Sequence, residues 1–348
     1  MIKKAIHTAM VLLVLSIVLI ACQDEYETRM PNVPDGYVAL RFRADIPAMQ
    51  EVTTRAVDED GKGVQNMTLF CFDTYGLFVT TVTAKVTPTS ETEGTFDASV
   101  PDHTRIIHFV ANQNMSEFPE DNFLGKAEAE VMALLQGSSG RMIYWARFAC
   151  APDNTAKINE QMSSEGIKLI RNHAQISLEN PQSQWIEVTG FKVYNTNAFG
   201  TVAPYHPQKG FDFTWPSDDS PFVTLPDNKA KMSDIQDVVT DMSQYVFECE
   251  NKEDDPVSVI IRGHLPGQTE TDDLYYRVML VNDNGEQILI RRNHHYKVNI
   301  DGTLAYGQKT FAEALEAAAT NNVWISISED VKEVEDQNYI LAVEQTTY

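Results

Sequence analysis

Apolar and polar positions alternate along many short stretches of this chain, and this pattern predicts a protein built mainly of β-strands. In the first stretch, which follows Gly36, every second residue is apolar and the residues between are polar or small. A period of two places the two sets of side chains on opposite faces of a strand, so we expect a half-buried strand over residues 37–47. Its expected core-facing side chains are Val38, Leu40, Phe42, Ala44 and Ile46.

Turn signals separate further runs that are rich in β-branched and aromatic residues. Two runs meet at residues 73–76, where Gly76 can supply a positive φ, and this composition predicts a hairpin. Two long runs meet at residues 282–285, and Asn-Gly between alternating apolar runs is the strongest short signal for a hairpin. The last expected strands are VWISIS and NYILAVEQTTY.

Only two segments favour helices. Ala, Glu, Met and Leu in KAEAEVMALLQ predict a short helix, and Thr310 with Glu313 forms a capping box that opens a second one in FAEALEAAA. Many strands with few helices predict a mostly β protein of sandwiches. A composition break at 151–165 divides it into an N-terminal domain, 36–160, and a C-terminal domain, 161–348.

The N-terminus predicts an exported lipoprotein. Two lysines precede an apolar run at residues 9–21, which is shorter than the roughly 20 residues that span a membrane. Residues 1–21 are therefore expected to be a signal peptide. Its Leu-x-Ala-Cys ending resembles the lipobox of bacterial lipoproteins, so Cys22 is expected to be diacylated and to hold the precursor on the outer membrane. Residues 22–35 are polar and predict a tether.

Charge and cysteine usage exclude some classes of function. Without residues 1–21 the chain keeps 50 acidic residues and has a formal charge of about −25, so phosphate would repel it and nucleic acid is not an expected partner. Cys71, Cys150 and Cys249 show no metal-ligand spacing, and their odd number argues against a disulfide framework. We expect them to be buried free thiols.

The motifs of common enzymes are absent. The sequence has no GxSxG, GxxxxGK[ST], HExxH or GxGxxG, so we expect no catalytic activity, no metal and no cofactor. Residues 137–140 are expected to be a loop, and His294 and His295 should point to opposite faces of a strand. Of the four tryptophans, Trp145, Trp185 and Trp324 lie in strand-like contexts that predict core packing. Trp215 lies in a loop-like context and could stack on a sugar.

Arg55 lies in EVTTRAVDED, a polar stretch between the first strand and the first hairpin, where a protease could reach the backbone. A cut between Arg55 and Ala56 would free the first strand and leave an open apolar groove, which captures another strand by β-augmentation. At the other end of the chain, residues 339–348 form a candidate donor strand. Its alternating apolar anchors are Ile340 with Ala342, or Leu341 with Val343.

Several stretches, in their order and spacing, resemble the fimbrillin family, the subunits of type V pili of anaerobic Gram-negative bacteria. Besides the lipobox they are TTRAVDEDGKGVQNMTLFCFDTYGLFV, LIRNHAQISLEN, VTGFKVYNTNAFGTVAPY and ILIRRNHHYKVNIDGTLAYGQKTFAEAL. The resemblance implies two tandem transthyretin-like β-sandwich domains with a few short helices. It also implies lipidation at Cys22, cleavage after Arg55 by an arginine-specific protease, loss of the strand 38–46, and head-to-tail donor-strand exchange with other pilus subunits.

The expected function is therefore that of a structural and adhesive subunit of a cell-surface fimbrium. Two alternatives stay open at this point. The chain could be an anchor subunit that keeps its first strand and stays on the membrane. It could also be a monomeric surface lipoprotein that binds glycans through exposed aromatic residues such as Trp215.

Overall fold

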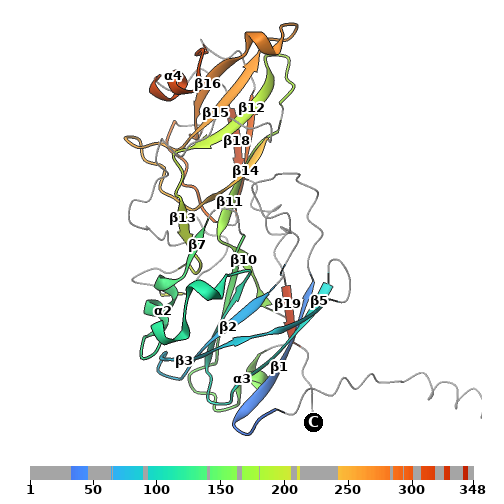
Figure 1. Cartoon of the computed structure of the whole chain (residues 1–348), viewed down its shortest axis with the longest axis vertical. Coiled ribbons are helices and arrows are strands. Elements are labelled where there is room, and N and C mark those ends of the chain that lie inside the picture. The colour runs from blue at the N-terminus through green and yellow to red at the C-terminus, as the bar shows by residue number, and fades with distance from the viewer. Residues whose placement is uncertain are drawn as a thin grey trace, which may run out of the picture. The chain divides into compact units, whose positions relative to one another are not determined.

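The computed structural model confirms a mostly β protein with a few short helices (Figure 1). It describes residues 33–45, 64, 66–88, 93–138, 142–162, 167–179, 181–204, 210–211, 242–282, 285–292, 294–300, 307–317, 325–329 and 340–343. No helix within these ranges is both long enough and apolar enough to cross a membrane.

Two five-stranded sheets contain most of the first half of the chain. One has the strand order β4-β5-β1-β19-β9 and the other the order β10-β8-β6-β2-β3. The strands of the first sheet are β1 (Tyr37–Asp45), β4 (Lys85–Pro88), β5 (Glu93–Pro101), β9 (Ile167–Lys168) and β19 (Ile340–Val343). Those of the second are β2 (Met67–Phe72), β3 (Phe78–Thr83), β6 (Ile106–Ala111), β8 (Tyr144–Ala149) and β10 (Ile170–Arg171).

These two sheets pack face to face over one hydrophobic core. Leu40 of β1 and Phe96 of β5 contribute from one sheet, and Leu69 of β2 and Phe109 of β6 contribute from the other. Along β5 buried and half-buried residues alternate from Thr95 onward, as expected for a strand with one face in a core. The sandwich that the sequence predicted at this end of the chain is thereby confirmed.

The other face of the second sheet is covered as well. Helix α2 (Glu128–Leu134) places Val131 and Met132 against it, so that every residue of β2 is buried. Two hydrogen bonds through His108 hold the helix against this face of the sheet. Trp145 donates from Nε1 to Nδ1 of His108 (2.9 Å), so the His108 proton is on Nε2, which donates to Oε1 of Glu128 (2.9 Å). Burial lowers the pKa of His108, which keeps the ring neutral.

The second half of the chain forms two further sheets, with the strand orders β14-β11-β17-β18 and β12-β15-β16. A second core, which includes Ile176, Phe191, Ile261 and Val298, lies between them. The strands are β11 (His173–Leu178), β12 (Glu187–Tyr194), β14 (Ser243–Phe247), β15 (Ser258–His264), β16 (Leu274–Met279), β17 (His295–Ile300) and β18 (Ile325–Glu329). Besides α2, the described residues contain the short helices η1 (Met115–Glu117), η2 (Glu120–Asn122), α3 (Ile158–Gln161), η4 (Glu270–Asp272) and α4 (Phe311–Glu316). The predicted domain division near residue 160 stays a prediction.

A short ribbon pairs β7 (Gln136–Ser138) with β13 (Phe199–Thr201), so the prediction of a loop at residues 137–140 was wrong for its first part. Glycine is required at both central positions. A Cβ atom would lie 2.4 Å from Nδ2 of Asn172 at Gly137 and 2.4 Å from Cδ1 of Phe247 at Gly200. The reason for these glycines is thus close packing and not a flexible turn.

A buried ion pair lies beside this ribbon. The Arg292 guanidinium donates from Nε to the Glu248 carboxylate, from Nη2 to Oγ1 of Thr201 (2.6 Å) and from Nη1 to the carbonyl of Val202 (3.0 Å). Both charged side chains are almost fully buried. Because each charge has a partner and the guanidinium makes further hydrogen bonds, the cost of removing both from water is offset.

Local turn and cap predictions agree well with the structure. β2 and β3 form a hairpin in which Gly76 has φ +72°, and the α4 capping box is present, with Glu313 N donating to Oγ1 of Thr310 (3.2 Å). The predicted hairpin at 282–285 forms only beside its turn, where Val281 and Gln287 pair antiparallel, and the prediction of two long paired strands was wrong. Asn282 N does donate to the carbonyl of Glu286 (2.9 Å), which closes a turn. However, β16 pairs with β15, whereas β17 pairs with β11 and β18 in the other sheet.

The tryptophan predictions had mixed outcomes. Trp145 is 4% exposed and lies in the core, as expected. Trp185, just before β12, is 36% exposed, so the prediction of core packing was wrong for it. Trp215 and Trp324 lie outside the described residues.

Candidate functional site

The strand that the sequence predicted to be removable is β1, and it is a central strand of its sheet. β1 pairs antiparallel with β5 over nine residues, from Tyr37 opposite Pro101 to Asp45 opposite Glu93. On its other side β1 pairs with β19 over four residues. Removing β1 would therefore expose the whole edge of β5.

The side chains of β1 join it to β5 as well. Val38 and Leu40 are buried in the core, at 7% and 1% exposure. On the other face, Nε of Arg41 donates to Oδ1 of its register partner Asp97 at 2.8 Å. Opposite charges at directly facing positions add about 0.2 to 1 kcal/mol to a strand pair. β1 thus supplies core surface, backbone pairing and one cross-strand ion pair.

The predicted donor strand lies beside the predicted removable strand in this chain (Figure 1). β19 pairs antiparallel with β1, from Phe42 opposite Val343 to Asp45 opposite Ile340, and its first two residues also pair with β9. The sequence singled out both segments by their alternation but gave no sign that they pair. Strand partners that are about 300 residues apart leave no local signal.

The structure describes only part of the predicted site. Val38 and Leu40 are in β1 with buried side chains, Phe42 and Ala44 are in the same strand, and Ile340, Leu341, Ala342 and Val343 make up β19. Cys22, Ile46, Arg55 and Ala56 lie outside the described residues. Lipidation and cleavage at these positions therefore stay predictions.

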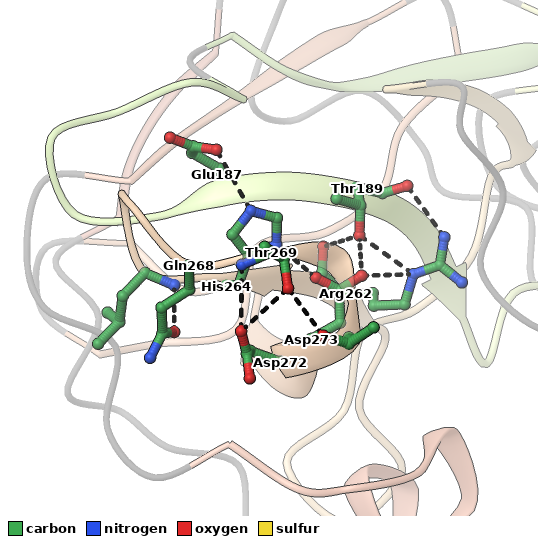
Figure 2. A network of polar contacts seen from close by, with 10 residues as sticks. Glu187, Thr189, Arg262, His264, Gln268, Thr269, Asp272 and Asp273 are labelled. Carbon is green, nitrogen blue, oxygen red and sulfur yellow. Dashed lines mark hydrogen bonds and ion pairs between the residues drawn. The ribbon is translucent and has the colours of Figure 1, made fainter.

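A polar network that no sequence motif indicated lies at one end of β12 and β15 (Figure 2). Figure 2 shows His264 of β15 between two carboxylates. Its Nδ1 lies 2.6 Å from Oδ1 of Asp273, and its Nε2 lies 3.2 Å from Oε2 of Glu187. Asp273 also accepts from Oγ1 of Thr189 and lies 3.4 Å from Nε of Arg262. The residues come from separate segments, so no sequence spacing could reveal the cluster.

The network favours a charged histidine. Ionised carboxylates only accept hydrogen bonds, so both ring nitrogens of His264 donate, as in the imidazolium. The hydrogen bond that His264 donates to Asp273 raises the pKa of His264, and Glu187 acts in the same direction. The network joins the loop before β16 to the ends of β12 and β15, and it uses no residue of β1 or β19.

We expect His264→Gln to destabilise the protein more at pH 6 than at pH 9. A raised folded-state pKa gives stability that is fully present below the ordinary histidine pKa and is lost as the pH rises through the folded value. Losing hydrogen bonds between charged groups should lower the free energy of unfolding by on the order of 1 kcal/mol at pH 6. Urea denaturation at both pH values measures this. His103→Gln, at a largely exposed histidine, is the matched control. An equal loss at both pH values would contradict a charged His264.

Three cysteines lie within the described residues. Cys71 and Cys249 are buried and form no disulfide, as predicted, whereas Cys150 is only half-buried. Burial raises the pKa of Cys71 to about 12, so its thiol is protonated and a poor nucleophile at neutral pH. Within the described ranges no three His, Cys, Asp or Glu side chains are placed to hold a metal ion. His294 and His295 have different partners: the Arg292 carbonyl (2.9 Å) and Oγ of Ser177 (2.8 Å).

Comparison with known proteins gives a clear relative. The chain is 23% identical to the major fimbrium tip subunit FimE of Porphyromonas gingivalis over an alignment of 335 positions that covers 93% of the chain. The resemblance to fimbrial subunits that the sequence indicated is thereby confirmed. The aligned part spans 58% of FimE, so this chain corresponds to little more than half of that relative. No protein-family model matches the chain.

Solved structures also resemble this chain. The tip fimbrial protein Mfa3 from Porphyromonas gingivalis, with a C-terminal truncation, is 14% identical with a TM-score of 0.47, and the match covers 85% of this chain and 100% of that one. A protein of Parabacteroides distasonis described as a cell adhesion protein is also 14% identical, with a TM-score of 0.46 and coverage of 90% and 99%.

Proposed function

We propose that this protein is a fimbrillin, a structural and adhesive subunit of a cell-surface fimbrium, and has no catalytic activity. In this proposal it is exported as a lipoprotein held on the outer membrane through Cys22. An arginine-specific protease then cuts after Arg55, and donor-strand exchange joins the subunit head to tail to other subunits. The names of its relatives, a fimbrium tip subunit, a tip fimbrial protein and a cell adhesion protein, support the first part.

The observation that carries the rest is the connectivity of β1. Among the described elements β1 is the first along the chain, and only residues 46–66 join it to β2. Arg55 lies within this connection. One cut there leaves a central strand of the sheet without any covalent link to the rest of the fold. Of the strands of this sheet, β1 is the one that a single cut at Arg55 would detach.

The position that β1 would vacate is suited to another strand. It would uncover nine residues of β5 backbone and the buried side chains Phe96, Ala98 and Val100. An unpaired edge beside an open core recruits an extended segment, because the new strand restores both hydrogen bonds and apolar burial. Refilling the places of Val38 and Leu40 alone would contribute about 1.5 to 3 kcal/mol each.

The experiment that tests cleavage uses purified residues 32–348, which lack Cys22 and Arg29. Limited digestion with an arginine-specific protease should give a first product that begins at Ala56, identified by mass spectrometry. Arg141, which also lies outside the described residues, serves as an internal comparison. A protein that resists cutting after Arg55, or that is cut only elsewhere, would favour a membrane-retained anchor subunit that keeps β1.

A further inference from the structure

The C-terminal strand has a place of its own in the uncleaved chain. β19 lies between β1 and the edge strand β9, so it covers the edge of β1 that faces away from β5. In Figure 1 it appears as a red strand beside the blue β1. The predicted donor is therefore already paired before any partner subunit is present.

Most of the backbone pairing that holds β19 comes from β1. Four residue pairs join β19 to β1, whereas two join it to β9. Because β19 is only four residues long, each pair is a large part of what fixes its position. A change that removed β1 would leave β19 as a short edge strand with one weak neighbour, and isolated short pairings are at best marginally stable in water.

We propose that β1 and β19 block each other in the precursor, so that one cut at Arg55 both opens the acceptor groove and releases the donor strand. This inference rests on the proposed function and adds its regulation. While β1 is in place, β5 has no free edge and β19 is held in its own chain. When β1 leaves, β5 becomes an acceptor and β19 loses four of its pairs at the same moment. Subunits that have not been cut therefore have neither a free β5 edge to accept a strand nor a free β19 to donate.

Strand direction favours exchange with a second subunit over refilling within one chain. β5 and β19 are both antiparallel to β1, so they run in the same direction. To take the place of β1 in its original direction, β19 of the same chain would have to turn end over end. A donor strand that arrives from another subunit can enter in the antiparallel direction without this rearrangement.

A cross-link between the two strands tests the blocked state directly. Ala44 and Leu341 are register partners. Directly opposite residues are close enough for a disulfide, which needs Cα atoms within about 7 Å. In residues 32–348 with Cys150→Ser, the pair Ala44→Cys with Leu341→Cys should oxidise to an intramolecular disulfide in most molecules. Arg43→Cys with Ala342→Cys is a second pair that guards against a local folding defect.

The matched control is Ala39→Cys with Leu341→Cys. Ala39 is in the same strand, five residues before Ala44, which places it about 16 Å further along at roughly 3.3 Å per residue. It should not cross-link. Non-reducing electrophoresis and peptide mass spectrometry read out the bond. Absence of the disulfide in both test pairs, or an equal yield in the control, would overturn the inference.

Polymerisation of the cross-linked protein after the cut tests this inference separately from the proposed function. After the cut at Arg55, the oxidised test pair should stay monomeric, because the disulfide holds β1 and β19 together, and a reductant should start polymerisation. If cut wild-type protein does not polymerise, the proposed function fails whatever the cross-link shows. If wild-type protein polymerises and the oxidised, cut pair polymerises equally fast, the proposed function stands and the mutual block is wrong.

Discussion

An Arg55→Ala variant is expected to fold and reach the cell surface but to form no fimbriae. The substitution lies in a polar stretch, so the free energy of unfolding should change by no more than about 0.5 kcal/mol. It removes the side chain at which the proposed protease would cut, so β1 would stay covalently attached and β5 would keep its partner over nine residues. Electron microscopy of the cells and the size of the extracted protein measure the result.

The control for this variant is Arg55→Lys. Lysine keeps the positive charge and the polarity of the stretch but is not a substrate for an arginine-specific protease. Both variants should therefore lack fimbriae, which shows that cleavage and not charge is the requirement. Fimbriae of normal number and length from Arg55→Ala cells would show that a cut at this position is not the switch for assembly.

Deleting residues 339–348 is expected to give a subunit that accepts a strand but cannot donate one. The deletion removes β19 and leaves β1, β5 and the core between the two sheets in place. Burial of about four apolar donor side chains would contribute on the order of 6 to 12 kcal/mol before ordering costs. Since 1.4 kcal/mol corresponds to a factor of ten in affinity, losing them should abolish head-to-tail contacts at micromolar concentrations.

Mixing the deletion variant with full-length protein tests the role of the donor strand more directly. Cut deletion variant added to cut full-length protein should bind one end of each growing polymer and stop it there, so the mean length should fall as the fraction of variant rises. Deleting only residues 344–348 leaves β19 intact and is the matched control, which should polymerise like the wild type. An unchanged length distribution with the longer deletion would move the donor to another segment, of which β18 is the nearest candidate.

Local features of the fold were predictable from the sequence because each depends on neighbouring residues. The alternation in β1, the turn at Gly76 and the capping box at Thr310 and Glu313 all have short-range physical causes, and the structure has all three. Where two segments distant in sequence decide the outcome, prediction failed. A hydrogen bond between Asn282 and Glu286 closes the predicted turn, yet β16 and β17 on its two sides belong to different sheets.

In the candidate site, too, local features were predictable and long-range contacts were not. The sequence identified β1 and β19 as separate strands with apolar alternation, but their pairing depends on a contact between the two ends of the chain. The network around His264 also depends on residues that only folding brings together. Trp185 looked like a core residue because its neighbours Ile186 and Val188 are apolar, and these two residues are buried while Trp185 is half-exposed.

The measurement that tests the central claim most directly is the mass distribution of purified residues 32–348 before and after the cut at Arg55. Size-exclusion chromatography with light scattering should show a monomer before digestion. After digestion it should show a ladder of multiples of the mass of residues 56–348, with the β1 peptide absent from the larger species. Protein that is cut after Arg55, has lost the β1 peptide and remains strictly monomeric would contradict assembly by strand exchange.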